Sequence, residues 1–194
     1  MSIHKEDQDM KIFTTSQRSL EFAEAERIVA ELEHERQNGN LARARKLGAR
    51  LAEEVSKIGE PGNSFGYLVE VQEDDAQAKE TVQQRKILLA FAIESSIAVY
   101  SPSKLIGTTI LNTYYEMLST CAKDFYDTIS FAGAFSLYYL DLRRGIKVSR
   151  AIGKTFAKLC GKEGDQVYEE LGYALNCRFY DTVCRLVDEA NFQD

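Results

Sequence analysis

The chain has 194 residues, a formal net charge of −6, 44% hydrophobic and 28% charged residues, and only two prolines. This composition is typical of a globular protein with a buried core and argues against extensive disorder. The negative net charge excludes a chain-wide basic surface that would bind nucleic acid. Residues 1–11 contain no apolar signal segment, so we expect a cytoplasmic protein whose four cysteines are free, buried thiols.

The N-terminal part of the chain predicts a helical hairpin. Residues 1–13 are polar and are expected to form a loose tail. A helix is predicted over residues 16–37, because apolar side chains recur on one stripe that includes Phe22, Val29 and Leu32. Gly39 suits the left-handed position that ends this helix, and Asn40 suits the cap of the next one. Residues 14–59 are therefore predicted to form an antiparallel hairpin.

The turn of this hairpin, Asn38-Gly39-Asn40-Leu41-x-x-Ala44, resembles the turn between the two helices of a tetratricopeptide repeat. The resemblance covers only the hairpin. Gly48 stands where that repeat has an aromatic residue, and the expected period of about 34 residues is not visible. A helical hairpin with a glycine turn is the simpler interpretation.

The rest of the chain predicts a linker and a helical bundle. Glycine and proline in residues 59–66 indicate a linker at 60–73, followed by a bundle over 74–194. A helix predicted up to Tyr100 is apolar on nearly all sides after Ile87, so it should be central. Further helices are expected over 103–122, 125–144, 148–160 and 166–190, with Asp124 and Asp165 as caps. The fold class is all-α with about seven helices, and one compact unit that includes the hairpin is the alternative.

An internal repeat accompanies this pattern. Aligned to itself at an offset of 54 residues, the chain matches at nine of the 26 positions from 104 to 129, including Phe-Tyr-Asp-Thr at 125–128 and 179–182. Repetition at such a period is typical of stacked helical units. Repeated packing residues are the simplest explanation. The functional interpretation is a pseudo-symmetric groove for a cationic or hydroxylated ligand, lined by Tyr126, Asp127, Tyr180 and Asp181.

Glu94 is the other candidate ligand-binding residue. It lies within the apolar run of residues 87–100, which is too short to span a bilayer. A carboxylate in such surroundings is expected to be hydrogen-bonded to nearby helix groups or to reach a crevice. We therefore expect any site in this protein to be acidic and lined by tyrosines.

Metal and cofactor chemistry is not expected. The cysteines lack paired C-x-x-C spacing, and only one Glu-x-x-His pair occurs, Glu31 with His34, whereas a carboxylate di-iron bundle needs two such pairs. With two histidines in all, a histidine base or a thiol–histidine pair is nearly excluded, so we expect a non-enzyme. Gly153-Lys154-Thr155 lacks the preceding strand and first glycine of a phosphate-binding loop.

Three functions are consistent with these features. The leading hypothesis is a non-catalytic helical interaction or regulatory module that binds a protein partner or itself, with no membrane. The alternative is a small-ligand-binding bundle with an acidic, tyrosine-lined pocket. The third is a DNA-binding regulator, because residues 156–171 resemble a helix-turn-helix, although Asp165, Glu169 and Glu170 on its second helix would repel phosphates.

Overall fold

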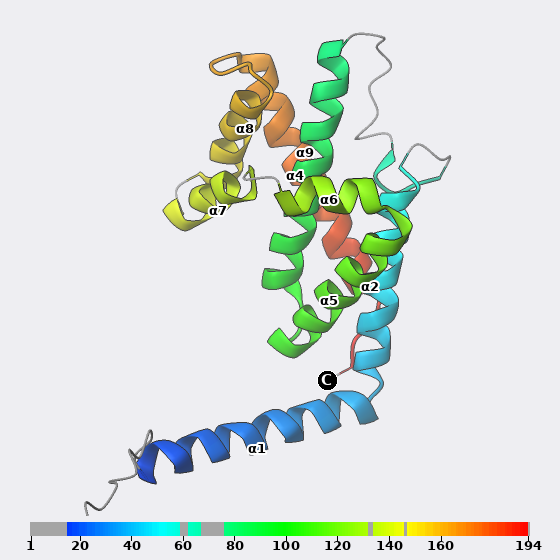
Figure 1. Cartoon of the computed structure of the whole chain (residues 1–194), viewed down its shortest axis with the longest axis vertical. Helices are drawn as coiled ribbons and strands as arrows, with labels where there is room; N and C mark the ends of the chain where they lie inside the picture. Colours follow the sequence, from blue (N-terminus) through cyan, green and yellow to red (C-terminus); the bar gives the residue numbers. More distant parts are fainter. Residues whose placement is uncertain (1–14, 59–61, 67–75, 132–133, 146, 194) are drawn as a thin grey trace, which may run out of the picture. The chain divides into compact units, whose positions relative to one another are not determined.

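The fold is all-α, as predicted. The computed structural model describes residues 15–58, 62–66, 76–131, 134–145 and 147–193, with the side chains of 15–21, 76–80, 131 and 134 excepted. These residues form eight helices and no strand. With the labels of Figure 1, they are α1 (Thr15–Gln37), α2 (Asn40–Ser56), α4 (Ala76–Tyr100), α5 (Lys104–Cys121), α6 (Lys123–Phe131), α7 (Ala134–Arg144), α8 (Val148–Leu159) and α9 (Gln166–Glu189). The predicted tail at 1–13 and most of the predicted linker at 60–73 lie outside the described residues.

The chain divides into two compact units, Met1–Asn38 and Gly39–Asp194. The described part of the first unit is α1 with the turn residue Asn38. Gly39 has a φ of 82°, so the predicted left-handed conformation at this turn is confirmed. Because the predicted hairpin of residues 14–59 spans both units, the packing of its first helix against its second stays a prediction.

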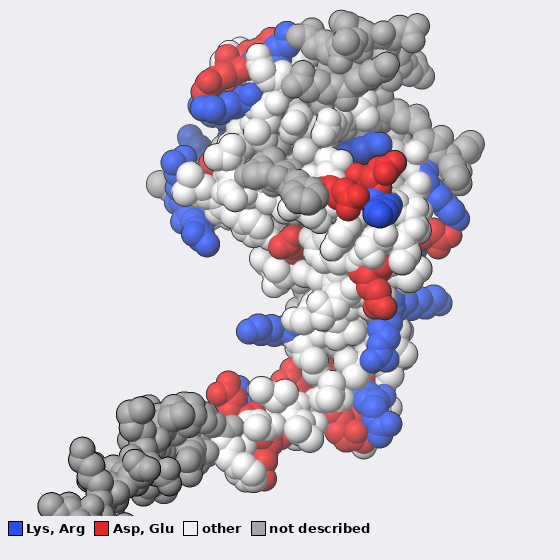
Figure 2. All heavy atoms as spheres, in the orientation of Figure 1, with Lys and Arg blue, Asp and Glu red and all other residues white. Residues whose placement is uncertain are grey.

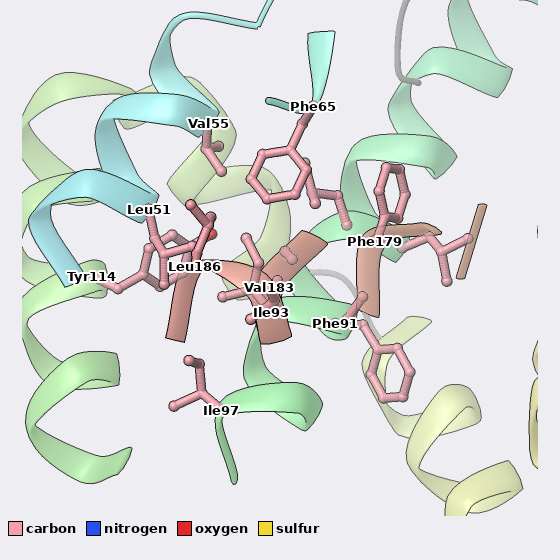
Figure 3. Close-up of a cluster of buried hydrophobic side chains, with 14 of the residues drawn as sticks. Leu51, Val55, Phe65, Phe91, Ile93, Ile97, Tyr114, Phe179, Val183 and Leu186 are labelled. Atoms are coloured by element: carbon pink, nitrogen blue, oxygen red, sulfur yellow. The ribbon is translucent and has the colours of Figure 1, made fainter. Parts of the chain in front are cut away.

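The centre of the second unit is α4, as its apolar sequence predicts. It packs against α5, α6, α7, α8 and α9, and every residue from 87 to 93 is buried. Figure 3 shows how side chains from α2, α4, α5 and α9 converge on one core. Each large apolar side chain in such a core contributes about 1.5–3 kcal/mol relative to its exposed state. The labelled members are Leu51, Val55, Phe65, Phe91, Ile93, Ile97, Tyr114, Phe179, Val183 and Leu186.

Two helix pairs approach each other closely at a glycine. Where α2 crosses α5, a Cβ atom on Gly48 would lie 2.4 Å from the carbonyl oxygen of Ile110. Where α8 crosses α9, a Cβ atom on Gly153 would lie 2.4 Å from the carbonyl oxygen of Glu169. Both positions require glycine, because any side chain would overlap the backbone of the facing helix. Gly153 therefore serves helix packing inside α8.

The predicted segmentation needs one correction. Residues 125–144 were predicted as one helix, whereas the structure has two, α6 and α7. The sequence contains Gly133 between them, and glycine costs about 1 kcal/mol relative to alanine inside a helix. The predicted break near Asp124 is confirmed, because α5 ends at Cys121 and α6 begins at Lys123, but Asp124 lies inside the first turn of α6 and not at its cap position. The cap at Asp165 is also confirmed, since its carboxylate accepts a hydrogen bond from the Val167 amide at 2.9 Å.

The structure does not confirm the 54-residue repeat. Gly107 is buried inside α5, whereas its match Gly161 lies in a turn with a φ of 68°. Phe125 lies near the start of α6, whereas its match Phe179 is in the middle of α9. The matching residues therefore occupy different places in their helices.

The predicted capping role of Asn40 is wrong. The cap position of α2 is Gly39, and no side chain caps it. Asn40 is 1% exposed, and its amide pairs with the backbone near the end of the chain. Its Nδ2 donates to the carbonyl oxygen of Gln193 at 2.7 Å, and its Oδ1 accepts from the Gln193 amide at 2.9 Å. The side chain thus joins the start of α2 to the segment after α9.

We expect Asn40→Ala to lower the free energy of unfolding by about 1–3 kcal/mol, because it leaves two backbone groups without their partners. Denaturant titration measures this change, and amide exchange at Gln193 should accelerate. Gln193→Ala is the matched control, because it keeps the two backbone groups of Gln193 that bind Asn40, and it should be nearly neutral. Equal losses in the two variants would contradict this account.

Two further expectations concern the whole chain. All four cysteines are free thiols, as predicted, but only Cys160 is buried, and Cys121 is exposed. Among the described helices, none combines the length and apolar character that crossing a membrane requires.

Candidate functional site

Glu94 forms a polar cluster with two tyrosines from other helices. It lies half-buried on α4, where its carboxylate accepts a hydrogen bond at each oxygen. The Tyr115 hydroxyl, from α5, donates to Oε2 at 2.6 Å, and the Tyr139 hydroxyl, from α7, donates to Oε1 at 2.5 Å. Hydrogen bonds to a charged group contribute about 1.5–3 kcal/mol each. This Glu94–tyrosine cluster therefore ties three helices together.

Each of these two tyrosines directly follows another tyrosine, which lies in the core and does not bind Glu94. Tyr114 and Tyr138 are fully buried, and their hydroxyls have no hydrogen-bond partner among the described residues. The Tyr138 ring packs against Phe91 with 4.9 Å between centroids. In each doublet, the first tyrosine fills the core and the second holds Glu94.

Burial keeps these four phenols protonated. It raises the pKa of Tyr115 and Tyr139, and the hydrogen bond to Glu94 raises it further. It also raises the pKa of Tyr114 and Tyr138 well above the ordinary value of 10.0. A protonated phenol donates a hydrogen bond but is a poor base or nucleophile. The cluster is therefore suited to holding helices together rather than to catalysis.

These shifts predict a steep loss of stability in alkali. A raised folded-state pKa gives stability that is complete below the unfolded pKa of 10.0 and is lost as the pH rises towards the folded pKa. The buried Tyr114 and Tyr138 together should remove about 2.7 kcal/mol per pH unit above that value. Denaturant titrations at increasing pH measure the loss. Phenolate absorbance of these two tyrosines should appear only as helicity disappears, and ionisation of all ten tyrosines in the folded protein would contradict the prediction.

One of the predicted repeat residues lies beside the cluster. The Tyr126 ring, on α6, is 6.5 Å from the Tyr115 ring in an edge-on arrangement. Its neighbour Asp127 is half-buried and makes no hydrogen bond or ion pair within the described part of the chain. The structure thus brings Tyr126 close to Glu94 through Tyr115.

The other two predicted residues lie on the outer side of α9. Tyr180 and Asp181 are exposed. Burial and the adjacent Cys184 raise the pKa of Tyr180. Nearby, the Tyr100 hydroxyl, at the end of α4, donates to Asp188 Oδ1 at 3.1 Å. No described interaction joins Tyr180 or Asp181 to the α6 residues of the predicted groove.

The prominent surface pockets among the described residues include four that neither Glu94 nor Asp127 lines. One of about 570 Å³ follows α2, and one of about 350 Å³ lies between α2 and the end of α9. Lys46 and Arg50 line both. Within the same residues, no group of three or more metal-binding side chains comes together.

Sequence reasoning missed Tyr115 and Tyr139. The available signal was the pair of tyrosine doublets, 114–115 and 138–139, at similar places in two apolar helices. It also missed the cations of α2, which recur at helical spacing.

Comparisons with known proteins give no match: no family model fits the chain, and neither a curated protein nor a solved structure is significantly similar to it. The functional argument therefore rests on the side chains themselves.

Proposed function

We propose that this chain is a non-catalytic helical interaction module that binds a protein partner through the outer side of α9. The observation that carries the proposal is a group of polar and aromatic side chains there, called the tyrosine–aspartate face. Its tyrosines, Tyr100 and Tyr180, are 42% and 37% exposed. Exposed tyrosines are enriched in protein interfaces, because a rigid ring supplies contact area and a hydroxyl. The face consists of Tyr100, Tyr180, Asp181, Cys184 and Asp188.

The arrangement of this face follows from helix geometry. Tyr180, Cys184 and Asp188 are spaced four apart, so they lie one above the other on α9. Tyr100 reaches the same place from α4 through its hydrogen bond to Asp188. The face carries two carboxylates, and Arg185, one turn from Asp181, is already paired with Glu189. A partner with lysine or arginine side chains would complement both the carboxylates and the tyrosine rings.

The small-ligand alternative has less support. Both oxygens of Glu94 already accept hydrogen bonds from tyrosines of the chain. A ligand would have to displace at least one of these bonds, each worth about 1.5–3 kcal/mol.

The DNA-binding alternative also has less support. The start of α9 carries Asp165, Glu169 and Glu170, and Arg150 of α8 is paired with Glu170 at 2.5 Å. Figure 2 shows acidic side chains beside basic ones over the α8–α9 turn. Phosphate contacts dominate DNA affinity, and these carboxylates oppose them.

Site-specific cross-linking in the full-length protein tests the proposal. A photoreactive residue is placed at Tyr180, and at Val167 as the control, since Val167 is 75% exposed on the same helix. We expect the Tyr180 derivative to cross-link a basic protein, and Asp181→Lys to abolish the product. Cross-linking to a second copy would identify the partner as the chain itself. Equal products from the two positions, or none from Tyr180, would overturn the proposal.

A further inference from the structure

We infer that the pocket between α2 and the end of α9 binds a phosphoryl group attached to an apolar body. This site is separate from the tyrosine–aspartate face. It has a volume of about 350 Å³, within the range of small-ligand sites. The residues that carry the argument are Arg43, Lys46, Leu47, Arg50, Leu186 and Glu189.

The cations of this pocket come from one face of α2. Arg43, Lys46 and Arg50 are spaced three and four residues apart, so their side chains project to the same side of the helix. Lys46 is exposed and has no hydrogen bond or ion pair within the described part of the chain. Its ammonium group is therefore available to an incoming anion.

Charge balance favours a phosphoryl group over a carboxylate. Three cations and the single carboxylate of Glu189 leave two positive charges in the pocket. A phosphoryl group carries about −1.5 to −2 charge near neutral pH, whereas a carboxylate carries only one negative charge. Arginine also binds phosphate oxygens through two parallel N–H groups.

Glu189 positions Arg50 rather than blocking it. Arg50 Nη1 lies 2.8 Å from Glu189 Oε2, and Glu189 also pairs with Arg185. These arginines lower the pKa of Glu189, with Arg50 as the larger cause, so the carboxylate stays charged. A guanidinium group has five N–H donors, and this contact leaves others for a ligand.

The apolar part of the pocket indicates what the phosphoryl group is attached to. Leu47 and Leu186 are buried beneath the cations, and the half-buried Ala190 and the aliphatic stems of the cations provide the accessible apolar surface. The pair of bonds between Asn40 and Gln193 holds the segment after α9 in place beside it. An aromatic or aliphatic phosphate monoester would contact both this apolar surface and the cations.

A longer polyanion fits this surface less well. The neighbouring 570 Å³ pocket is lined by Glu53 and Glu54 as well as Lys46 and Arg50. Along α2, the cations at positions 43 to 50 come first, and Glu53 and Glu54 follow within one turn. Successive phosphates of a nucleic acid would therefore meet carboxylates of α2, whereas one phosphoryl group in this pocket meets three cations and one carboxylate, Glu189, that is already paired with arginines.

Calorimetric titration of the full chain with phenyl phosphate tests this inference. Lys46→Glu should weaken binding by about tenfold or more, because it removes a charged contact and adds repulsion. Arg45→Glu is the control: it makes the same change of charge on the next residue, which lies outside the pocket. It should change the affinity by less than about twofold. Helicity and thermal midpoint verify that both variants fold, and Lys46→Gln provides a milder second variant.

The outcomes separate the sources of the group. Benzoate, which has one negative charge, should bind more weakly than phenyl phosphate. Inorganic phosphate, which has no apolar group, should also bind more weakly than phenyl phosphate. If a phosphotyrosine peptide binds more tightly than phenyl phosphate, the source of the phosphoryl group is a modified protein. If the two bind equally, the source is a small metabolite. No binding of phenyl phosphate, or equal loss in the two glutamate variants, would overturn the inference.

Discussion

Tyr115→Phe and Tyr139→Phe should each lower the free energy of unfolding by about 1.5–3 kcal/mol, the contribution of a hydrogen bond to a charged group. Each substitution removes only a hydroxyl and keeps the ring, so core packing is unchanged. The loss arises because one oxygen of the half-buried Glu94 is left without its donor. Denaturant titration measures the change, provided that the slope of the transition is unaffected.

The other members of the doublets are matched controls. Tyr114→Phe and Tyr138→Phe remove hydroxyls that are buried without a partner. These substitutions should be neutral or raise the stability by up to about 1 kcal/mol, since an unsatisfied buried hydroxyl is unfavourable. In each doublet, only the substitution of the second tyrosine should thus lower the stability. If all four variants lose the same stability, the tyrosines matter for packing alone.

A double-mutant cycle separates the two bonds to Glu94. Glu94→Gln removes the charge, so the added effect of Tyr115→Phe in that background should fall below its effect in the natural chain. Additive effects would show that the Tyr115 hydroxyl does not act through Glu94.

The second large effect is expected at the helix crossings. Gly48→Ala and Gly153→Ala should each destabilise the fold by about 1–3 kcal/mol, despite the higher helix propensity of alanine. A Cβ atom at either position overlaps a backbone carbonyl at 2.4 Å, and a backbone cannot rotate away as a side chain can. The two helices would have to separate, which exposes core side chains on both sides of the contact.

Gly107→Ala provides the comparison for this effect. Gly107 is also buried in a helix, but its Cβ atom would meet the Ser101 side chain at 3.3 Å and no backbone atom closer than 3.4 Å. The substitution should therefore change the stability by less than about 1 kcal/mol. Thermal unfolding of the three variants tests the ranking. A loss at Gly107 as large as at Gly48 would contradict the role of backbone contact.

Local sequence carried most of the information about the helices. The uninterrupted apolar residues from 87 to 93 predicted a central helix, because a helix without a polar side must be surrounded. Asp165 predicted the start of α9, since a cap depends only on the next three residues. The capping role of Asn40 was predicted wrongly, because only its neighbours in the sequence were considered. Asn40 has the composition of a cap, but its partner, Gln193, is distant in sequence.

The candidate site was less predictable, because it depends on which helices are neighbours. Glu94 is conspicuous in an apolar run, yet nothing within α4 indicates that its partners come from α5 and α7. The repeat drew attention to Tyr126 and Tyr180, whose matching sequences lie in helices with different boundaries. Identical packing residues do not require identical surroundings. The cations of α2 were visible at helical spacing, but the wall opposite them comes from the far end of the chain.

The contact between Asn40 and Gln193 also has a topological consequence. It brings the first helix of the second unit and the segment after its last helix to the same place, so the backbone of this unit nearly closes into a ring. Circular permutation is tolerated when the original ends are adjacent and the new ends fall in an exposed turn. The turn at Gly161 and Gly164 is such a place, since both residues are exposed between α8 and α9. In a permuted chain whose original ends are joined and whose new ends lie in this turn, α9 would be synthesised first. The helix α4 would then pack against an α9 that has already formed.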